Sequence, residues 1–128
     1  MTIFLKSIFH IAILFLVIVS IYPGSIIGYL FYGDWGLQPT IIENPFGTTI
    51  NHFFAYLFLS LIGFTNYLKR SKEKKLFYIL IVLATILELV HFVIPNRSFQ
   101  IGDIIGNILG VIVAYFLVRF YLHFIKYE

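Results

Sequence analysis

Apolar residues fall into four long runs along the chain, and each run is long enough to cross a bilayer as a helix. The runs cover residues 3–22, 50–68, 76–94 and 104–121. A hydrocarbon core of about 30 Å needs about 20 mainly apolar residues in helical form. The pattern therefore predicts an all-α, polytopic membrane protein, with a single domain over residues 1–128 built as a bundle of about four transmembrane helices.

The first run ends at Pro23 and Gly24, which break a helix. A cleaved signal peptide would have a shorter apolar run and small residues at both cleavage-site positions, and residues 19–23 do not provide such a pair. We therefore expect a retained helix. The apolar segment 25–32 is too short to cross, and its pattern fits either a re-entrant tail or a segment at the membrane interface.

Composition supports the membrane interpretation. Of the 128 residues, 60% are hydrophobic and only 12% are charged, and the mean hydropathy is +0.95. So few charges cannot cover the core of a soluble domain, so lipid is the expected surrounding solvent. The absence of cysteine excludes disulfides, thiolate metal sites and cysteine nucleophiles. The net charge of +3 does not indicate a nucleic-acid partner, because the basic residues concentrate in one short segment.

That basic segment, residues 69–75, predicts the orientation. It holds five basic residues beside one acid and connects the second and third runs. The positive-inside rule places such a connection in the cytoplasm. Both termini then lie in the cytoplasm too, with Lys6, Arg119 and Lys126 on the same side and Arg97 outside. We expect a multi-pass protein of the plasma membrane.

Glu88 is the most unusual polar residue in the runs. A charge at the centre of a membrane helix costs about 2.5–3.5 kcal/mol on insertion scales, so it needs an explanation. Glu88 precedes Pro95 by seven residues, which places it about 10 Å below the outer end of the third run. It must point into the bundle, find a cation or stay protonated, and Arg97, the cation expected on this side, is a candidate partner.

Two further pairs of polar residues sit near the same outer ends. His52 and Tyr56 are four residues apart in the second run, and Asp103 and Asn107 are four apart at the start of the fourth. Residues at this spacing share one helix face. With Glu88 they are expected to form one polar layer at the outer face of the membrane.

Helix four also carries a stripe of small residues. Gly106, Gly110 and Ala114 recur every fourth position, a pattern that lets another helix approach closely. We expect this stripe to pack against the third run.

The segment from Glu88 to Gly110 resembles the signature of the VanZ-like membrane protein family. Its Glu, Pro, Arg, Asp, Asn and Gly stand at the family's intervals, and residues 51–56 resemble its second motif, a His followed by Tyr. Two positions depart from it: Thr48-Thr49 stands where an Asp-Lys pair is usual, and His91 where Gln is common. The resemblance implies a small bacterial helical-bundle membrane protein whose namesake is linked to teicoplanin resistance, but it supplies no reaction.

The polar layer allows two interpretations. As a site, Arg97 would bind a phosphate or carboxylate, and Glu88 or His52 would be the catalytic candidates for proton transfer. As structure, Glu88 and Arg97 would form a buried ion pair that fixes the connection between the third and fourth runs. Asp103 also has a structural alternative, capping the N-terminus of the fourth helix.

Ligand-binding roles are expected for four residues of the layer: Arg97, Asp103, Asn107 and Tyr56.

A metal site is chemically conceivable, since His and carboxylate ligands suit zinc or manganese. The available residues are His52, Glu88, His91 and Asp103. No tight ligand motif is present, and the family commonly has Gln at the position of His91. We therefore predict no metal and no cofactor.

These observations lead to two hypotheses of different classes. In the first, an outward-facing polar pocket binds or acts on an anionic cell-envelope component, such as a lipid or peptidoglycan-precursor head group, and affects glycopeptide resistance. In the second, the chain is a structural or assembly subunit that contacts other membrane proteins and performs no chemistry. The sequence leaves open whether any reaction is catalysed.

Overall fold

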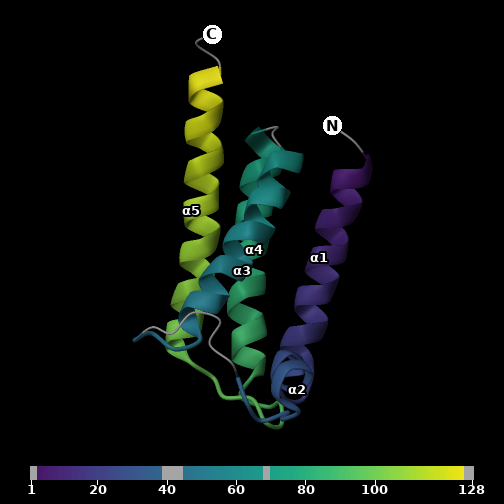
Figure 1. Ribbon diagram of the computed structural model, residues 1–128. Coiled ribbons are helices and arrows are strands. Elements are labelled where there is room, and N and C mark those ends of the chain that lie inside the picture. Colours follow the sequence, from purple (N-terminus) through teal and green to yellow (C-terminus); the bar gives the residue numbers. More distant parts are fainter. Residues whose placement is uncertain (1–2, 39–44, 68–69, 126–128) are drawn as a thin grey trace.

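The protein is a bundle of long helices joined by compact connections (Figure 1). The computed structural model describes residues 3–38, 45–67 and 70–125, and in these ranges it contains five helices and no strand. Their bounds are α1 Ile3–Ile21, α2 Ile26–Tyr32, α3 Thr49–Asn66, α4 Arg70–Val90 and α5 Ile101–Ile125. The four long helices run up and down alternately, so the start of α1 and the end of α5 lie at the same end of the bundle (Figure 1).

The helices follow the four apolar runs, with one clear correction. The basic segment predicted as a connection is mostly helical, because α4 begins at Arg70 rather than at residue 76. Lys and Glu are good helix formers, so nothing in this segment opposes the extension. Glu73 is fully buried and lies 3.4 Å from Arg119 of α5, which ties the added turns to the bundle.

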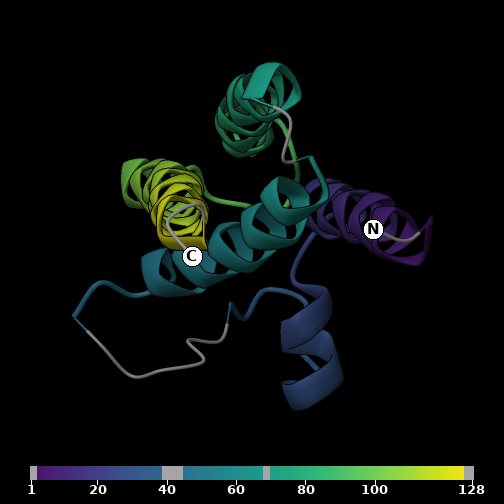
Figure 2. The ribbon, with the colours of Figure 1, turned by 90° about the horizontal axis from the view of Figure 1, so that it is seen from above.

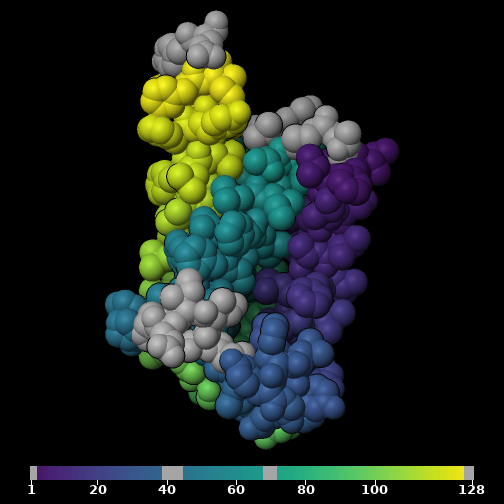
Figure 3. All heavy atoms as spheres, viewed as in Figure 1, coloured from purple at the N-terminus to yellow at the C-terminus, as the bar shows by residue number. Residues whose placement is uncertain are grey.

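The segment after Pro23, whose conformation the sequence left open, forms the short helix α2. The Ser25 hydroxyl caps it by accepting the Gly28 N–H at 2.9 Å. Gly33 ends it in the left-handed conformation, at φ 69°. The indole of Trp35 then folds back and stacks on Tyr29, with ring centroids 4.0 Å apart. Figure 3 shows α2 and the residues after it as a blue lobe at the lower end of α1.

Helix α3 occupies the middle of the bundle, with α5 on one side and α1 on the other (Figure 2). Its most extensive contact is with α5. The small-residue stripe of α5 faces this helix: a side chain at Gly106 would lie 2.5 Å from the Thr49 carbonyl oxygen, and one at Gly110 would lie 2.5 Å from that of Phe53. The stripe therefore packs against α3, and the expectation that it packs against the third run, now α4, was wrong.

Two of the described helices, α1 and α5, are long and apolar enough to cross a membrane. Helix α3 carries Asn51 and His52 at one end and Asn66 at the other, and α4 begins with charged residues. Large apolar side chains nevertheless remain exposed on all four long helices, among them Phe15, Phe58, Ile86 and Phe116. An exposed apolar surface of this kind marks a membrane or protein contact, and it indicates a membrane-embedded protein.

Candidate functional site

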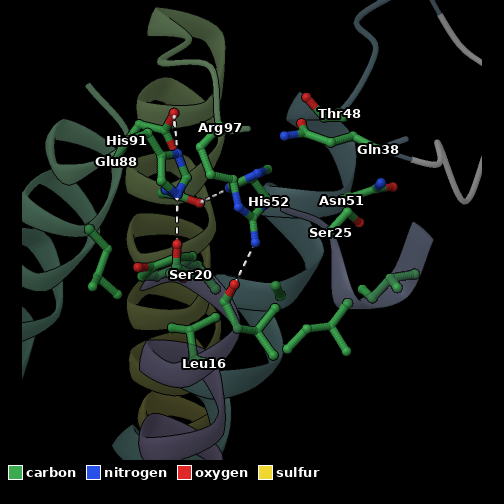
Figure 4. Close-up of a pocket in the computed structure, with 17 residues that line it drawn as sticks. Leu16, Ser20, Ser25, Gln38, Thr48, Asn51, His52, Glu88, His91 and Arg97 are labelled. Carbon is green, nitrogen blue, oxygen red and sulfur yellow. Dashed lines mark hydrogen bonds and ion pairs between the residues drawn. The ribbon is translucent and has the colours of Figure 1, made fainter. Parts of the chain in front are cut away.

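A cavity of about 200 Å³, lined by apolar side chains and by a group of polar ones, lies at the end of the bundle where α1 ends and α3 begins. Figure 4 shows its walls, which come from α1, α2, α3, α4, α5 and the connections between them. Five residues predicted from the sequence line it: His52, Tyr56, Glu88, Arg97 and Asn107. The sixth, Asp103, is buried behind His52. The predicted polar layer is therefore brought together in space.

His52 of α3 connects the two polar residues of α5. Its Nε2 lies 3.3 Å from a carboxylate oxygen of Asp103, and its Nδ1 lies 3.1 Å from the side-chain oxygen of Asn107. The spacing of Asp103 and Asn107 puts both on one face of α5, and the glycines beside them bring that face against α3. The imidazole is held at both nitrogens, which fixes its orientation.

Asp103 is held by two threonine hydroxyl groups to which the sequence analysis assigned no role in the site. The Thr48 hydroxyl donates to both carboxylate oxygens at 3.1–3.2 Å, and the Thr49 hydroxyl donates to one of them at 3.1 Å. Asp103 lies in the first turn of α5, but the hydrogen bonds of its carboxylate go to α3. It ties two helices together rather than capping its own. The feature of the sequence that could have pointed to these two residues is that Thr48-Thr49 departs from the family pattern.

Glu88 is 1% exposed, and two donors approach its Oε1 atom. His91 Nδ1 lies 3.1 Å away, one turn further along the chain, and the backbone N–H of Gln100 donates at 3.1 Å. Glu88 and Arg97 do not form an ion pair, so the structural alternative of a buried Glu88–Arg97 bridge is not the one that the protein adopts. The carboxylate takes local donors because Arg97 is engaged elsewhere.

Arg97 reaches the end of α1 instead. Its Nη2 donates to the Val19 carbonyl and its Nε donates to the Tyr22 carbonyl at 3.3 Å. His91 Nε2 lies 3.1 Å from the Ser20 carbonyl (Figure 4). The last carbonyls of a helix lack partners within the helix and carry its negative dipole end, so a cation there is favourable.

Burial lowers the pKa of the Arg97 guanidinium and the neighbouring Glu88 carboxylate raises it, yet an arginine side chain stays charged in proteins. The cavity wall therefore holds a fixed positive charge.

Tyr56 is 2% exposed and is one of the residues that line the same cavity, and its hydroxyl has no hydrogen-bond partner in the described parts of the chain. A buried hydroxyl without a partner is costly and needs an explanation. The residue is one turn beyond His52 on α3, as its spacing predicted.

Three groups of the cluster are close enough to share a metal ion. One ligand atom from each of His52, Glu88 and Asp103 lies within 4.8 Å of the others. His91, the fourth residue considered from the sequence, is turned toward Glu88 and the end of α1. The available donors are thus one imidazole and two carboxylates.

An all-helical bundle with exposed apolar faces and a buried polar cluster is the architecture of a small membrane-embedded protein with an internal polar site. The family model described as VanZ/LLP1 matches residues 3–123. The chain therefore belongs to the VanZ/LLP1 family, which confirms the resemblance read from its polar motifs. No curated protein and no solved structure matches it.

Proposed function

We propose that the chain is a plasma-membrane protein whose polar cavity opens to the outer face and binds the anionic head group of a cell-envelope component. The observation that carries the proposal is Arg97, a positively charged side chain set in the wall of a small cavity. Its Nε and Nη2 are used by α1, and Nη1 is left for a phosphate or carboxylate oxygen. Ser25 and Gln38 add neutral polar groups to the wall.

The proposal includes four crossings, by α1, α3, α4 and α5, with both termini in the cytoplasm. Lys6, Lys72 and Arg119 belong to the end of the bundle that holds the start of α1, the start of α4 and the end of α5 (Figure 1). Lys126 lies outside the described residues. The positive-inside rule then favours a cytoplasmic location for this end and an outer location for the cavity.

Cysteine labelling tests this orientation directly, because the natural chain has no cysteine. Ser98→Cys, beside the cavity, is expected to react with a membrane-impermeant maleimide in intact cells. Lys74→Cys, an exposed position in the basic first turns of α4, is expected to react only after the cells are opened. Labelling of Lys74→Cys in intact cells, with protection of Ser98→Cys, would show that the orientation is inverted.

The binding function is tested through Arg97. In a strain whose teicoplanin sensitivity depends on this protein, Arg97→Ala is expected to abolish the effect, and Arg97→Lys to restore only part of it. Lysine keeps the charge but cannot reproduce the guanidinium fork. Ser98→Ala, an exposed neighbour, is the matched control and should retain the effect. Protein levels in the membrane are measured for each variant, and full activity of a normally accumulating Arg97→Ala protein contradicts the proposal.

A second candidate function is a structural or assembly subunit. It is favoured by one observation. Arg97 donates to two carbonyl groups at the end of α1 and His91 contacts a third, so the polar layer also holds helices together. Under this function the resistance phenotype follows the amount of folded protein and does not depend on the anion. Loss of the phenotype in proportion to loss of protein across the Arg97 variants would favour the subunit.

A further inference from the structure

We infer that His52, Glu88 and Asp103 form a binding site for a first-row divalent metal ion in the floor of the polar cavity. Their ligand atoms lie within 4.8 Å of one another, although the residues come from three different helices. The sequence analysis predicted no metal, because no pair of these residues has a short ligand spacing. The inference does not depend on head-group binding, and the experiment below tests it without lipid.

The distances suit a metal between these groups. Two ligands about 2.1 Å from a tetrahedral metal are about 3.4 Å apart, and His52 Nε2 lies 3.3 Å from an Asp103 carboxylate oxygen. Glu88 is the third ligand, and its ligand atom, within 4.8 Å of the other two, lies at most about 1.4 Å beyond the same spacing. A metal ion would thus lie between His52 Nε2 and the Asp103 carboxylate.

The groups that hydrogen-bond to the proposed ligands are those that a metal site requires. Metal-bound histidines donate their second ring N–H to a fixed acceptor, which leaves the other nitrogen's lone pair for the metal. The side-chain oxygen of Asn107, 3.1 Å from His52 Nδ1, is such an acceptor. With the proton on Nδ1, Nε2 faces Asp103 as a ligand.

The two carboxylates are also fixed from behind. Thr48 and Thr49 hold the Asp103 carboxylate through their hydroxyl groups. His91 and the backbone N–H of Gln100 both approach the Oε1 atom of Glu88. These contacts leave Oε2 of Glu88 for coordination and reduce the entropy that would be lost when an ion binds.

Tyr56 provides an independent indication of a ligand. The residue lines the cavity together with His52 and Glu88, and its hydroxyl is buried and has no hydrogen-bond partner within the described residues. Three protein ligands leave at least one coordination position of the metal for water. A metal-bound water in this cavity would be a hydrogen-bond partner for the Tyr56 hydroxyl.

The charge of the cluster is also consistent with a cation. Glu88 and Asp103 are 1% and 2% exposed, and two negative charges this close are unfavourable without a positive charge between them. Arg97 is directed to the carbonyls of α1 and does not pair with either. One imidazole with two carboxylates and no thiolate is a donor set that suits Zn²⁺ or Mn²⁺.

The test is metal binding by the purified full-length chain in detergent, carried on an affinity tag without histidine. After removal of metal with a chelator, Zn²⁺ is titrated by calorimetry, and bound metal is counted by elemental analysis after dialysis. The wild type is expected to bind one Zn²⁺ per chain. His52→Ala, Glu88→Gln and Asp103→Asn are each expected to weaken binding at least about 100-fold, and Asn107→Ala about 10- to 100-fold.

His10→Ala is the matched control, since His10 is an exposed histidine on α1 that bonds only to the Lys6 carbonyl. It should bind Zn²⁺ like the wild type. Circular dichroism confirms that each variant is folded, and Asp103→Asn and Glu88→Gln preserve side-chain shape if His52→Ala does not fold. Failure of the wild type to retain Zn²⁺, or equal retention by all the ligand variants, would overturn the site. If Arg97→Ala keeps the full teicoplanin effect, the proposed head-group binding fails, but normal Zn²⁺ binding by the wild type would still support the metal site.

Discussion

Gly110→Ala is expected to lower the stability of the bundle by about 2 kcal/mol, because the added methyl group has no space between α3 and α5. A Cβ at this position would lie 2.5 Å from the Phe53 carbonyl oxygen and 2.8 Å from the Leu57 backbone nitrogen. Both atoms belong to the backbone and cannot rotate away, so the helices must separate. Thermal unfolding in detergent, followed by circular dichroism, measures the loss as a lower midpoint.

Gly36→Ala is the matched control for this prediction. A Cβ at Gly36 would meet only the side-chain oxygen of Asp34, at 3.4 Å, which is an ordinary contact with a movable group. Its midpoint should stay close to that of the wild type. Equal midpoints for the Gly110→Ala and wild-type proteins would show that the close approach of α3 and α5 does not determine stability.

Arg119→Leu is expected to cost about 3 kcal/mol, because it leaves the buried carboxylate of Glu73 without its cation. The Glu73 side chain is 0% exposed and its Oε2 lies 3.4 Å from Arg119 Nη1. Its other oxygen, Oε1, has no hydrogen-bond partner in the described parts of the chain, so no second contact compensates. The same unfolding experiment measures the effect.

The double variant Glu73→Leu/Arg119→Leu separates charge from packing. Replacing both members of a buried pair by apolar groups removes the uncompensated charge, so most of the stability should return. Lys72→Leu, which removes an exposed charge from the same turn of α4, should change the midpoint little. A double variant as unstable as Arg119→Leu would mean that Arg119 acts through packing alone.

The helices were predictable because long apolar runs impose helical structure wherever water is excluded. Helix α1 ends within one residue of its predicted limit, since proline and glycine follow it. The prediction was wrong at the start of α4, where the charged residues were interpreted as a connection between helices. These charged residues are joined to the bundle through Glu73, which contacts Arg119. Arg119 lies far along the chain, so this contact exists only in the folded bundle.

The sequence predicted which residues belong to the candidate site, but it did not predict which of them contact one another. Polar residues in apolar helices are costly, and this singled out Glu88 without any structure. Arg97, Asp103 and Asn107 followed from their places at the outer ends of the runs. Sequence spacing defines which residues share a helix face, but it carries no information on how one helix is rotated against another. The Arg97 contact with α1 and the Asp103 contact with Thr48 therefore could not be read from the chain.

The sequence by itself determined that this is an all-helical chain with long apolar helices, that its basic residues concentrate in one short segment, and that its polar motif is that of the VanZ/LLP1 family. Only the tertiary structure decided that the glycines of α5 bring it against α3, and that His52, Glu88 and Asp103 meet within 4.8 Å. The reason is physical: composition and periodicity fix what each helix buries, whereas the contacts between helices depend on close packing across the whole bundle.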